Sequence, residues 1–388
     1  MLAIGVAAQA AGTLLVSTPA YLIVLLHTQQ GVSLTQGGLL ASAPTFGMVL
    51  TLVAWGAAAD RWGERGVIAT GSALSALAAL AAAFTNDFVW LAALLAAGGA
   101  AAASTNAASG RVVVGWFPRH RRGLAMGIRQ MSQPLGVAAA ALIVPPMAAA
   151  YGVAAPLFIV AAATGVLAIA ALLGIENPPR SAPAAAGGTS LAPTANPYRR
   201  DGFLARIHVL SVLLVVPQFT LSIFGIVWLS VGLGWSEAWA GAVIAAAQFI
   251  GALGRIGVGH LSDRVGSRVR VLRWVALAGV AAMVALAASA ALHWDALAAV
   301  LFIVATTISV ADNGLAFTSV AEAAGPGWSG RALGLQNTGQ FIAASAVGPG
   351  IGALVTLAGF PLALAAVALA PLISIPLIPA RDRDSSSE

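Results

Sequence analysis

The sequence predicts an all-α membrane protein with twelve transmembrane helices in two pseudo-symmetric six-helix bundles. Of its 388 residues, 59% are hydrophobic and only 8% are charged, whereas a soluble domain is about 25% charged. Apolar runs of roughly 20 residues, the length that spans a bilayer as a helix, recur from end to end. The pattern Gly-x-x-x-Asp-Arg-x-Gly-x-Arg occurs at residues 56–65 and again 203 residues later at 259–268. Two copies in register indicate an internal duplication.

The composition argues against several classes of protein. All 19 basic residues are arginine, and most cluster between the apolar runs, so the net charge of +6 indicates membrane topology and no nucleic-acid partner. The sequence has no cysteine for a thiol nucleophile and no lysine for a Gly-x-x-x-x-Gly-Lys phosphate loop. The five histidines form no i, i+4 pair. We therefore expect no catalytic residue, cofactor or metal site.

Residues 1–175 are expected to form the first six-helix bundle. The first apolar run, about residues 2–26, has neither a basic leader nor a cleavage site before a soluble domain and reads as a retained helix. Ser33 and Gln36 have the spacing of a capping box that opens the second helix. The other helices are expected from Val67 to about residue 86, from there to Gly115, after the loop 116–122, and up to Ile175.

Residues 176–202, rich in Pro, Ala, Gly and Ser, are expected to be a flexible cytoplasmic linker. Residues 203–380 then retrace the first half as a second six-helix bundle, and residues 381–388 form a cytoplasmic tail. Ser236 opens the eighth helix 203 residues after Ser33.

The remaining helices of the second half follow from the same pattern. The ninth helix is expected from Val271, and the tenth runs from the turn at 293–295 to about Ala323. Gly330 opens the eleventh helix, and the twelfth ends near Pro379.

Arginine predicts the orientation in the membrane. One set of alternate turns carries no arginine, and the opposite set carries almost all of it, together with both chain ends. The positive-inside rule places the arginine-rich set, and hence both termini, in the cytoplasm. We expect a multi-pass protein of a bacterial inner membrane that is a monomer in the lipid bilayer.

The two charged motifs resemble the loop signature of the major facilitator superfamily, and the stretch from Trp116 to Gly127 is also similar to that family. The resemblance covers essentially the whole chain. It implies two bundles that rock about a central site and give alternating access. It also implies that helices 1, 4, 7 and 10 line the cavity and that helices 2, 5, 8 and 11 form the bundle interface. Glu64 departs from the family pattern, in which a basic residue is commoner.

Two arginines fall inside the expected membrane segments. Arg129 lies about six residues into the fifth helix and Arg255 eight residues before Asp263 in the eighth, so both sit roughly 9–12 Å from the cytoplasmic ends. Gln133 and Gly136 follow Arg129 on one helical face, and Gln248 and Gly251 precede Arg255 on another, which predicts stripes facing a cavity. Because guanidinium groups match carboxylates, the pair predicts an anion site. The alternative is that either arginine pairs with Asp312 or with a backbone carbonyl and only holds the bundles together.

Polar residues on the expected cavity helices are further candidates. Asn106 and Asn313 are related by the repeat at 207 residues, and both are expected to contact substrate. Asp312 is the carboxylate expected to lie deepest and is the candidate for proton coupling; a permanent ion pair with Arg255 is the alternative. Gln336 is a substrate-binding candidate among the polar residues of helices 1, 7 and 11, several of which are expected only to hydrogen-bond neighbouring helices. These residues are Gln9, Thr13, Gln218, Gln336, Asn337 and Gln340.

The two charged motifs are expected to act as gates. The resemblance implies that Asp60 meets the start of the eleventh helix near Gly330 and that Asp263 meets the start of the fifth near Arg122, where free N–H groups and the helix dipole stabilise a carboxylate. Glu322 is expected to pair with an arginine of the second motif. The full set of gate residues is Asp60, Arg61, Arg65, Asp263, Arg264 and Arg268.

These features favour a secondary transporter of a small, monocarboxylate-like anion that is coupled to protons. An arginine at position 255 resembles that of monocarboxylate and oxalate-type carriers; a cyanate-type carrier would also use a small anion. Export of amphiphilic drugs or of other metabolites is the alternative, which the paired arginines disfavour. A non-transporting receptor is disfavoured because the sequence shows no soluble signalling domain. A membrane enzyme is disfavoured because no nucleophile–base arrangement stands out.

Overall fold

The computed structural model describes residues 1–116, 128–129, 131–177, 196–199, 201–324 and 328–383. Those residues are almost entirely helical. The first half contains six helices: α1 (Leu2–Gln30), α2 (Leu34–Trp62), α3 (Glu64–Ala83), α4 (Phe88–Trp116), α6 (Ser132–Tyr151) and α7 (Ala154–Gly174).

The second half follows one 3₁₀ turn in the linker, η1 (Pro197–Arg199). Its first helix, α8 (Phe203–Val227), is continued by a π-helical turn, η2 (Trp228–Gly232). The other helices are α9 (Glu237–Val265), α10 (Arg268–Ala291), α11 (Asp295–Ser309), α12 (Asp312–Ala324), α13 (Ser329–Val367) and α14 (Leu369–Ser374), and the last turn is η3 (Ile375–Leu377).

The described helices account for twelve membrane crossings. Eleven segments are long and apolar enough to span a bilayer, and the last of them, Arg331–Leu377, has 47 residues. At 1.5 Å per residue this segment would be about 70 Å long, which is twice what one crossing needs. Gly359, with φ of 76°, interrupts it and separates the eleventh crossing from the twelfth.

The helix caps explain where several helices begin. Ser33 and Gln36 form the predicted capping box of α2, with each side chain bonded to the backbone N–H of the other residue. Ser236 caps α9, as its repeat position predicts. The third and ninth helices each begin three residues earlier than expected, at Glu64 and Arg268, because Gly63 and Ser267 already stand at the N-cap position.

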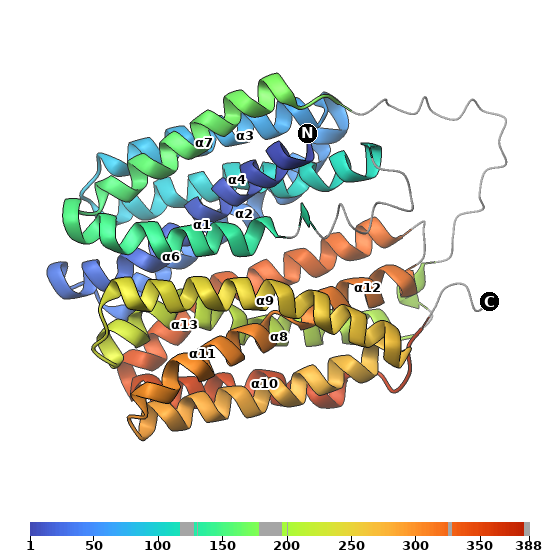
Figure 1. The fold of residues 1–388 in the computed structure, drawn as a ribbon. Coiled ribbons are helices and arrows are strands. Elements are labelled where there is room, and N and C mark those ends of the chain that lie inside the picture. The colour runs from blue at the N-terminus through green and yellow to red at the C-terminus, as the bar shows by residue number, and fades with distance from the viewer. Residues whose placement is uncertain (117–127, 130, 178–195, 200, 325–327, 384–388) are drawn as a thin grey trace.

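Figure 1 shows two groups of helices, α1 to α7 above and α8 to α14 below, with the N-terminus at the same end as the C-terminal ends of α7 and α12. We call this end the terminal end and the opposite one the far end. The halves meet where α2 packs on α13, α6 on α9 and α1 on α8. The expected interface between helices 2, 5, 8 and 11 is therefore present.

Glycines bring the two halves into backbone contact toward the far end. A Cβ added to Gly38 of α2 would lie 2.1 Å from the carbonyl oxygen of Gly348 in α13, and one added to Gly241 of α9 would lie 2.2 Å from that of Ala141 in α6. At Gly257, nearer the terminal end of α9, an added Cβ would meet no atom within 4 Å. The structure is therefore closed at the far end.

This contact predicts that Gly38→Ala weakens the closure of the far end. A methyl group against a carbonyl oxygen forces α2 away from α13, at a cost of about 1–3 kcal/mol for overpacking. The chain has no cysteine, so Thr45→Cys, two turns along the same face of α2, provides a single reporter. We expect a membrane-impermeant maleimide to modify Cys at position 45 from the far side several-fold faster in the Gly38→Ala background.

Gly257→Ala is the matched control, because its methyl group enters open space. It should leave the rate of modification unchanged. Equal rates in the two alanine backgrounds would show that the Gly38 contact does not hold the far end closed.

Candidate functional site

Two glutamine–asparagine pairs occupy repeat-related places in the two halves. In the first half, Gln9 Nε2 of α1 donates to Asn106 Oδ1 of α4 at 2.9 Å. In the second half, Asn313 Nδ2 of α12 donates to Gln218 Oε1 of α8, also at 2.9 Å. Each pair joins the two helices of its half that are expected to line the cavity. Asn106 and Asn313 are therefore each hydrogen-bonded to a glutamine of the same half.

Arg129 joins the first of these pairs. It lies in the short helical piece 128–129 ahead of α6, and its Nη2 donates to the backbone oxygen of Asn106 at 3.2 Å. Asn106 is only partly buried, and its Nδ2 has no hydrogen-bond partner among the described residues. Gln9, Asn106 and Arg129 therefore form one donor-rich cluster between α1, α4 and α6.

The second pair continues into a buried chain of hydrogen bonds. Gln340 Nε2 donates to Asn313 Oδ1 at 2.9 Å and to Ser211 Oγ at 2.7 Å. Gln336 Nε2 donates to the same Ser211 hydroxyl at 3.3 Å. Both polar groups of the Asn313 side chain are therefore engaged, unlike those of Asn106.

This chain ends in the linker. His208 Nδ1 contacts Gln336 Oε1 at 3.2 Å, and His208 Nε2 contacts the Tyr198 hydroxyl at 2.9 Å. Gln336, predicted to bind substrate, is 1% exposed and lies inside the bundle. The linker was expected to be flexible, yet its turn η1 docks through Tyr198, whose ring also packs against Trp328.

Arg255 lies against a break in the tenth crossing. The predicted helix from the 293–295 turn to Ala323 is two helices, because α11 ends at Ser309 and α12 begins at Asp312. The Ser309 hydroxyl donates back to the carbonyl of Thr306, and Asp312 and Asn313 are residue types that favour the first turn of a helix. Arg255 Nε donates to the carbonyl of Val310 in the break, at 3.2 Å.

Asp312 does not form the alternative ion pair. Its charge and that of Arg255 are near enough to interact, but no salt bridge joins them, and neither carboxylate oxygen has a hydrogen-bond partner. The side chain is 1% exposed. Because Arg255 is bonded to a backbone carbonyl, the carboxylate is left in an apolar pocket.

Helix packing supports a similar depth for the two arginines. The contact of Ala141 with Gly241 aligns α6 and α9, which run in opposite directions. From this contact Arg129 lies 12 residues back along the chain and Arg255 14 residues forward, so both lie toward the terminal end.

The stripes predicted beside the two arginines are partly taken up by packing against other helices. A Cβ on Gly136 would lie 2.5 Å from the backbone oxygen of Ala10, so this glycine serves the packing of α6 on α1. Gln133 is half-buried and Gln248 is 7% exposed. Neither makes a hydrogen bond within the described ranges.

The second gate motif is bound together by charge. Arg268 Nη1 lies 2.5 Å from Asp263 Oδ1, and Arg268 Nη2 lies 3.4 Å from Glu322 of α12. The predicted pairing of Glu322 with an arginine of this motif is present. Arg264 is exposed. Arg122, the expected neighbour of Asp263, lies outside the described residues.

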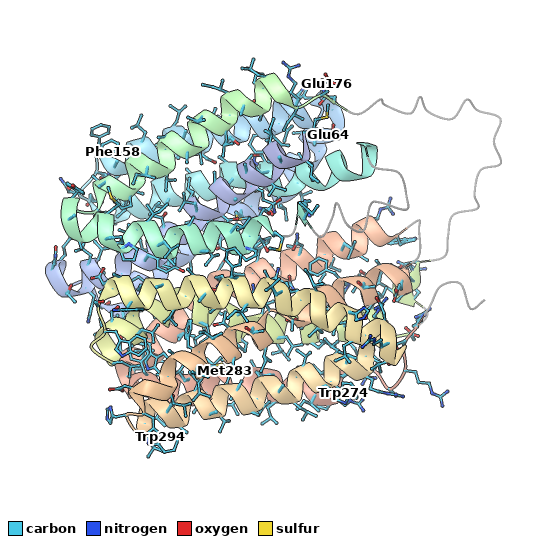
Figure 2. The ribbon with its side chains drawn as sticks, in the orientation of Figure 1. Glu64, Phe158, Glu176, Trp274, Met283 and Trp294 are labelled. Carbon is cyan, nitrogen blue, oxygen red and sulfur yellow. The ribbon has the colours of Figure 1, made fainter. Side chains whose placement is uncertain are left out.

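The first gate motif is described only in part. Arg61 lies over the ring of Trp62 at 5.8 Å, while the side chain of Asp60 is outside the described set. Glu64, the departure from the family pattern, is 5% exposed. Figure 2 shows Glu64 and Glu176 at the same end of the first bundle.

Two residues that no sequence motif points to, Asn177 and Asp382, bind the backbone beside the two charged motifs. Asn177, just after α7, accepts a hydrogen bond from the backbone N–H of Arg65 at 2.9 Å. Asp382, after the last helix, accepts one from the N–H of Val269 at 2.9 Å and one from the Ser267 hydroxyl at 2.5 Å. Each thus binds the first turn of the third helix of its half. The sequence does carry one indication of this role: Asn177 and Asp382 are polar residues 205 residues apart, close to the 203-residue spacing of the repeat.

No three His, Asp or Glu side chains gather as metal ligands in the part of the chain that the structure describes. The site instead consists of guanidinium, amide and hydroxyl groups. These groups can bind and orient an anion or a polar solute, but they provide no activated nucleophile.

Comparisons with known proteins agree with this architecture. The family model described as Major Facilitator Superfamily matches residues 2–349. An uncharacterized MFS-type transporter of Mycobacterium tuberculosis, Rv2994, is 45% identical over 374 residues, which are 96% of this chain and 82% of the relative.

Solved structures match at the level of the fold. A bacterial homologue of the human lysosomal transporter Spinster, in an inward-facing and occupied conformation, aligns with a TM-score of 0.77 at 15% identity, over 97% of this chain and 95% of its own. A D-xylose-proton symporter aligns with a TM-score of 0.76 at 16% identity, over 97% and 96% of the two chains. The family model covers most of the chain, and the Mycobacterium tuberculosis relative is similar over nearly the whole length of this chain. The chain, with its two six-helix halves, belongs to the major facilitator superfamily of membrane transporters.

Proposed function

We propose that this transporter moves a small, monocarboxylate-like organic anion by alternating access. The observation that carries the proposal is the cluster of Arg129, Asn106 and Gln9 in the first half, at about the depth of Arg255 in the second. A guanidinium group is a planar donor that matches a carboxylate. Placing two of them within the membrane is costly, and such residues usually serve a ligand or a partner.

The hydrogen bonds of the site favour an anion over a neutral solute. Arg255 has one described hydrogen bond, to a neutral carbonyl, so most of its five N–H groups remain available. Asn106 likewise offers the N–H groups of its amide, because only its oxygen is engaged. A carboxylate between the two halves would receive donors from both of them.

The conformation supports alternating access. The far end is closed by the glycine contacts, and the positive-inside rule favours a cytoplasmic terminal end. In that orientation the structure would correspond to an inward-facing state, from which an anion bound near Arg129 and Arg255 would exchange with the cytoplasm.

Drug efflux remains the second candidate because of one feature. Phe224, Trp228, Phe302 and Phe360 line an apolar pocket near the far end of the second half. An amphiphilic molecule would favour such a surface. The pocket lies within a single bundle, however, whereas the arginines come from both halves.

We propose further that Asp312 couples transport to protons. A carboxylate without a hydrogen-bond donor is unstable as an anion when it is buried, and protonation removes the charge. Its charge interaction with Arg255 links it to the anion site of the second half.

For the gates, we propose that Asp60, Arg61 and Arg65 of the first motif, and Asp263, Arg264 and Arg268 of the second, latch the cytoplasmic side when the far end opens. Asn177 and Asp382 keep the two loops in the required shape by binding backbone N–H groups. Because Asn177 and Asp382 do not contact substrate in this proposal, they would affect the rate of the transition between the inward-facing and outward-facing states and not substrate binding.

Substitution of the two arginines tests the anion site. In proteoliposomes, Arg129→Gln and Arg255→Gln should each lower the uptake of radiolabelled monocarboxylates roughly 10- to 100-fold, the equivalent of losing one charged hydrogen bond of about 1.5–3 kcal/mol. Arg270→Gln, at an exposed site near the terminal end, is the control and should transport normally. Intact uptake in both Gln variants would refute the anion site.

Asp312→Asn tests proton coupling. It should abolish accumulation driven by a pH gradient and spare counterflow, because the amide is neutral at every pH and still allows the carrier to exchange substrate. Asp295→Asn, the same change at the exposed start of α11, should accumulate substrate like the native protein. Unchanged accumulation in Asp312→Asn would exclude Asp312 as the proton carrier.

Asp382→Ala tests the positioning of the second gate. Loss of a helix cap is worth about 1 kcal/mol, so the maximal transport rate should fall about fivefold while KM stays the same. Asp382→Asn keeps the oxygen that accepts from Val269 and should restore most of the rate. The exposed neighbour Arg381→Ala is the control, and equal rates in all three variants would contradict a positioning role.

A further inference from the structure

Asp312 lines a small pocket that belongs entirely to the second half. The pocket lies between α8, α10, α11, α12 and α14. Its wall is largely apolar and includes Leu214, Pro217, Met283 and Pro371; Met283 is labelled in Figure 2 on α10. No residue of the first half contributes to it.

Adjacent residues at the start of α12 face different surroundings. Asp312 lines this pocket, while Asn313 is bonded to Gln218 and Gln340. The helix backbone therefore separates the carboxylate from the amide network next to the candidate anion site. A substrate held by Arg129 and Arg255 would not need to touch the pocket.

The carboxylate is poorly satisfied in this pocket. The backbone N–H groups of Asp312 and Asn313 lie near it, but neither oxygen makes a hydrogen bond of good geometry, and the side chain is 1% exposed. An ionised carboxylate would be strongly destabilised here, whereas a protonated one needs only a single acceptor. Ser309 supplies a nearby polar atom in the pocket: its hydroxyl donates to the Thr306 carbonyl, so its oxygen can still accept.

We propose that this pocket is a proton site separate from the substrate site, in which protonated Asp312 donates to one buried water that in turn donates to Ser309 Oγ. The inference rests on the proposed coupling role of Asp312 and adds where the proton is held. A buried water with two to four polar partners is a common element of protein interiors. A bare metal cation would need about six oxygen ligands, which this mostly apolar wall does not supply.

The break in the tenth crossing would transmit the protonation state. Asp312 is the first residue of α12, and Arg255 holds the carbonyl of Val310 two residues earlier. When Asp312 loses its proton, its charge attracts the guanidinium away from this neutral carbonyl. The move alters the geometry of the break and, through α12, the position of Asn313. Proton and substrate are then coupled by the helix and not by direct contact.

The first test uses substrate-free protein, so it is independent of the anion proposal. Thermal unfolding of the purified native chain and of Asp312→Asn is followed from pH 5 to pH 8 in sodium-free choline buffer. The amide imitates the protonated acid, so Asp312→Asn should unfold several degrees higher at pH 8, and the difference should vanish toward pH 5. A difference that does not depend on pH would overturn the proposal. So would a stabilisation by sodium ions that is seen only in the native chain.

The second test fills the pocket. A Cβ added to Gly279 would make ordinary contacts, 3.6 Å to Pro371 and 3.9 Å to Ile308, and the two methyl groups of Gly279→Val would extend beyond it into the space of the water. The variant should lose pH-driven accumulation and retain counterflow. Gly165→Val is the matched control in the first half, where the nearest atom to an added Cβ is also 3.6 Å away. Native accumulation in Gly279→Val would show that the pocket plays no part in coupling.

Discussion

The backbone contacts between the two halves at the far end determine the arrangement of everything else. Gly38 against Gly348 and Gly241 against Ala141 allow helices of different bundles to approach more closely than any side chain would permit. These contacts close the far end and leave Arg129 and Arg255 on the terminal side of the closure, 12 and 14 residues along the chain from the contact between Ala141 and Gly241.

The duplicated halves differ where polar groups are buried. Both contain a glutamine–asparagine pair between equivalent helices. Among the described residues, the second half alone bonds its asparagine to a further amide, that of Gln340, and alone carries a carboxylate at the helix start that follows the break. A polar group without a partner is costly within a membrane, so these departures from symmetry mark where ligands and protons would act. In the proposed function, both halves would bind the substrate, whereas the coupling carboxylate belongs to the second half alone.

Much of the fold was predictable because it depends on local patterns. Apolar length, the capping box at Ser33 and the spacing of the two charged motifs each reflect a few neighbouring residues. The break before Asp312 was not predicted, because Val310 and Ala311 are compatible with a helix and only the surrounding packing and the Arg255 contact favour a turn. Likewise, Gln336 reads as a cavity residue on a helical wheel, yet its amide bonds inward to Ser211 and His208.

The sequence by itself determined the membrane class, the twelve crossings, the duplication and the family, since each is written in composition or in periodic spacing. Tertiary structure decided which polar groups meet. Asn177 and Asp382 bind gate loops more than a hundred residues away, and Arg255 bonds to Val310 and not to Asp312. Such pairings depend on how helices rotate and approach one another. That geometry results from the packing of the whole bundle and is not encoded at any single position.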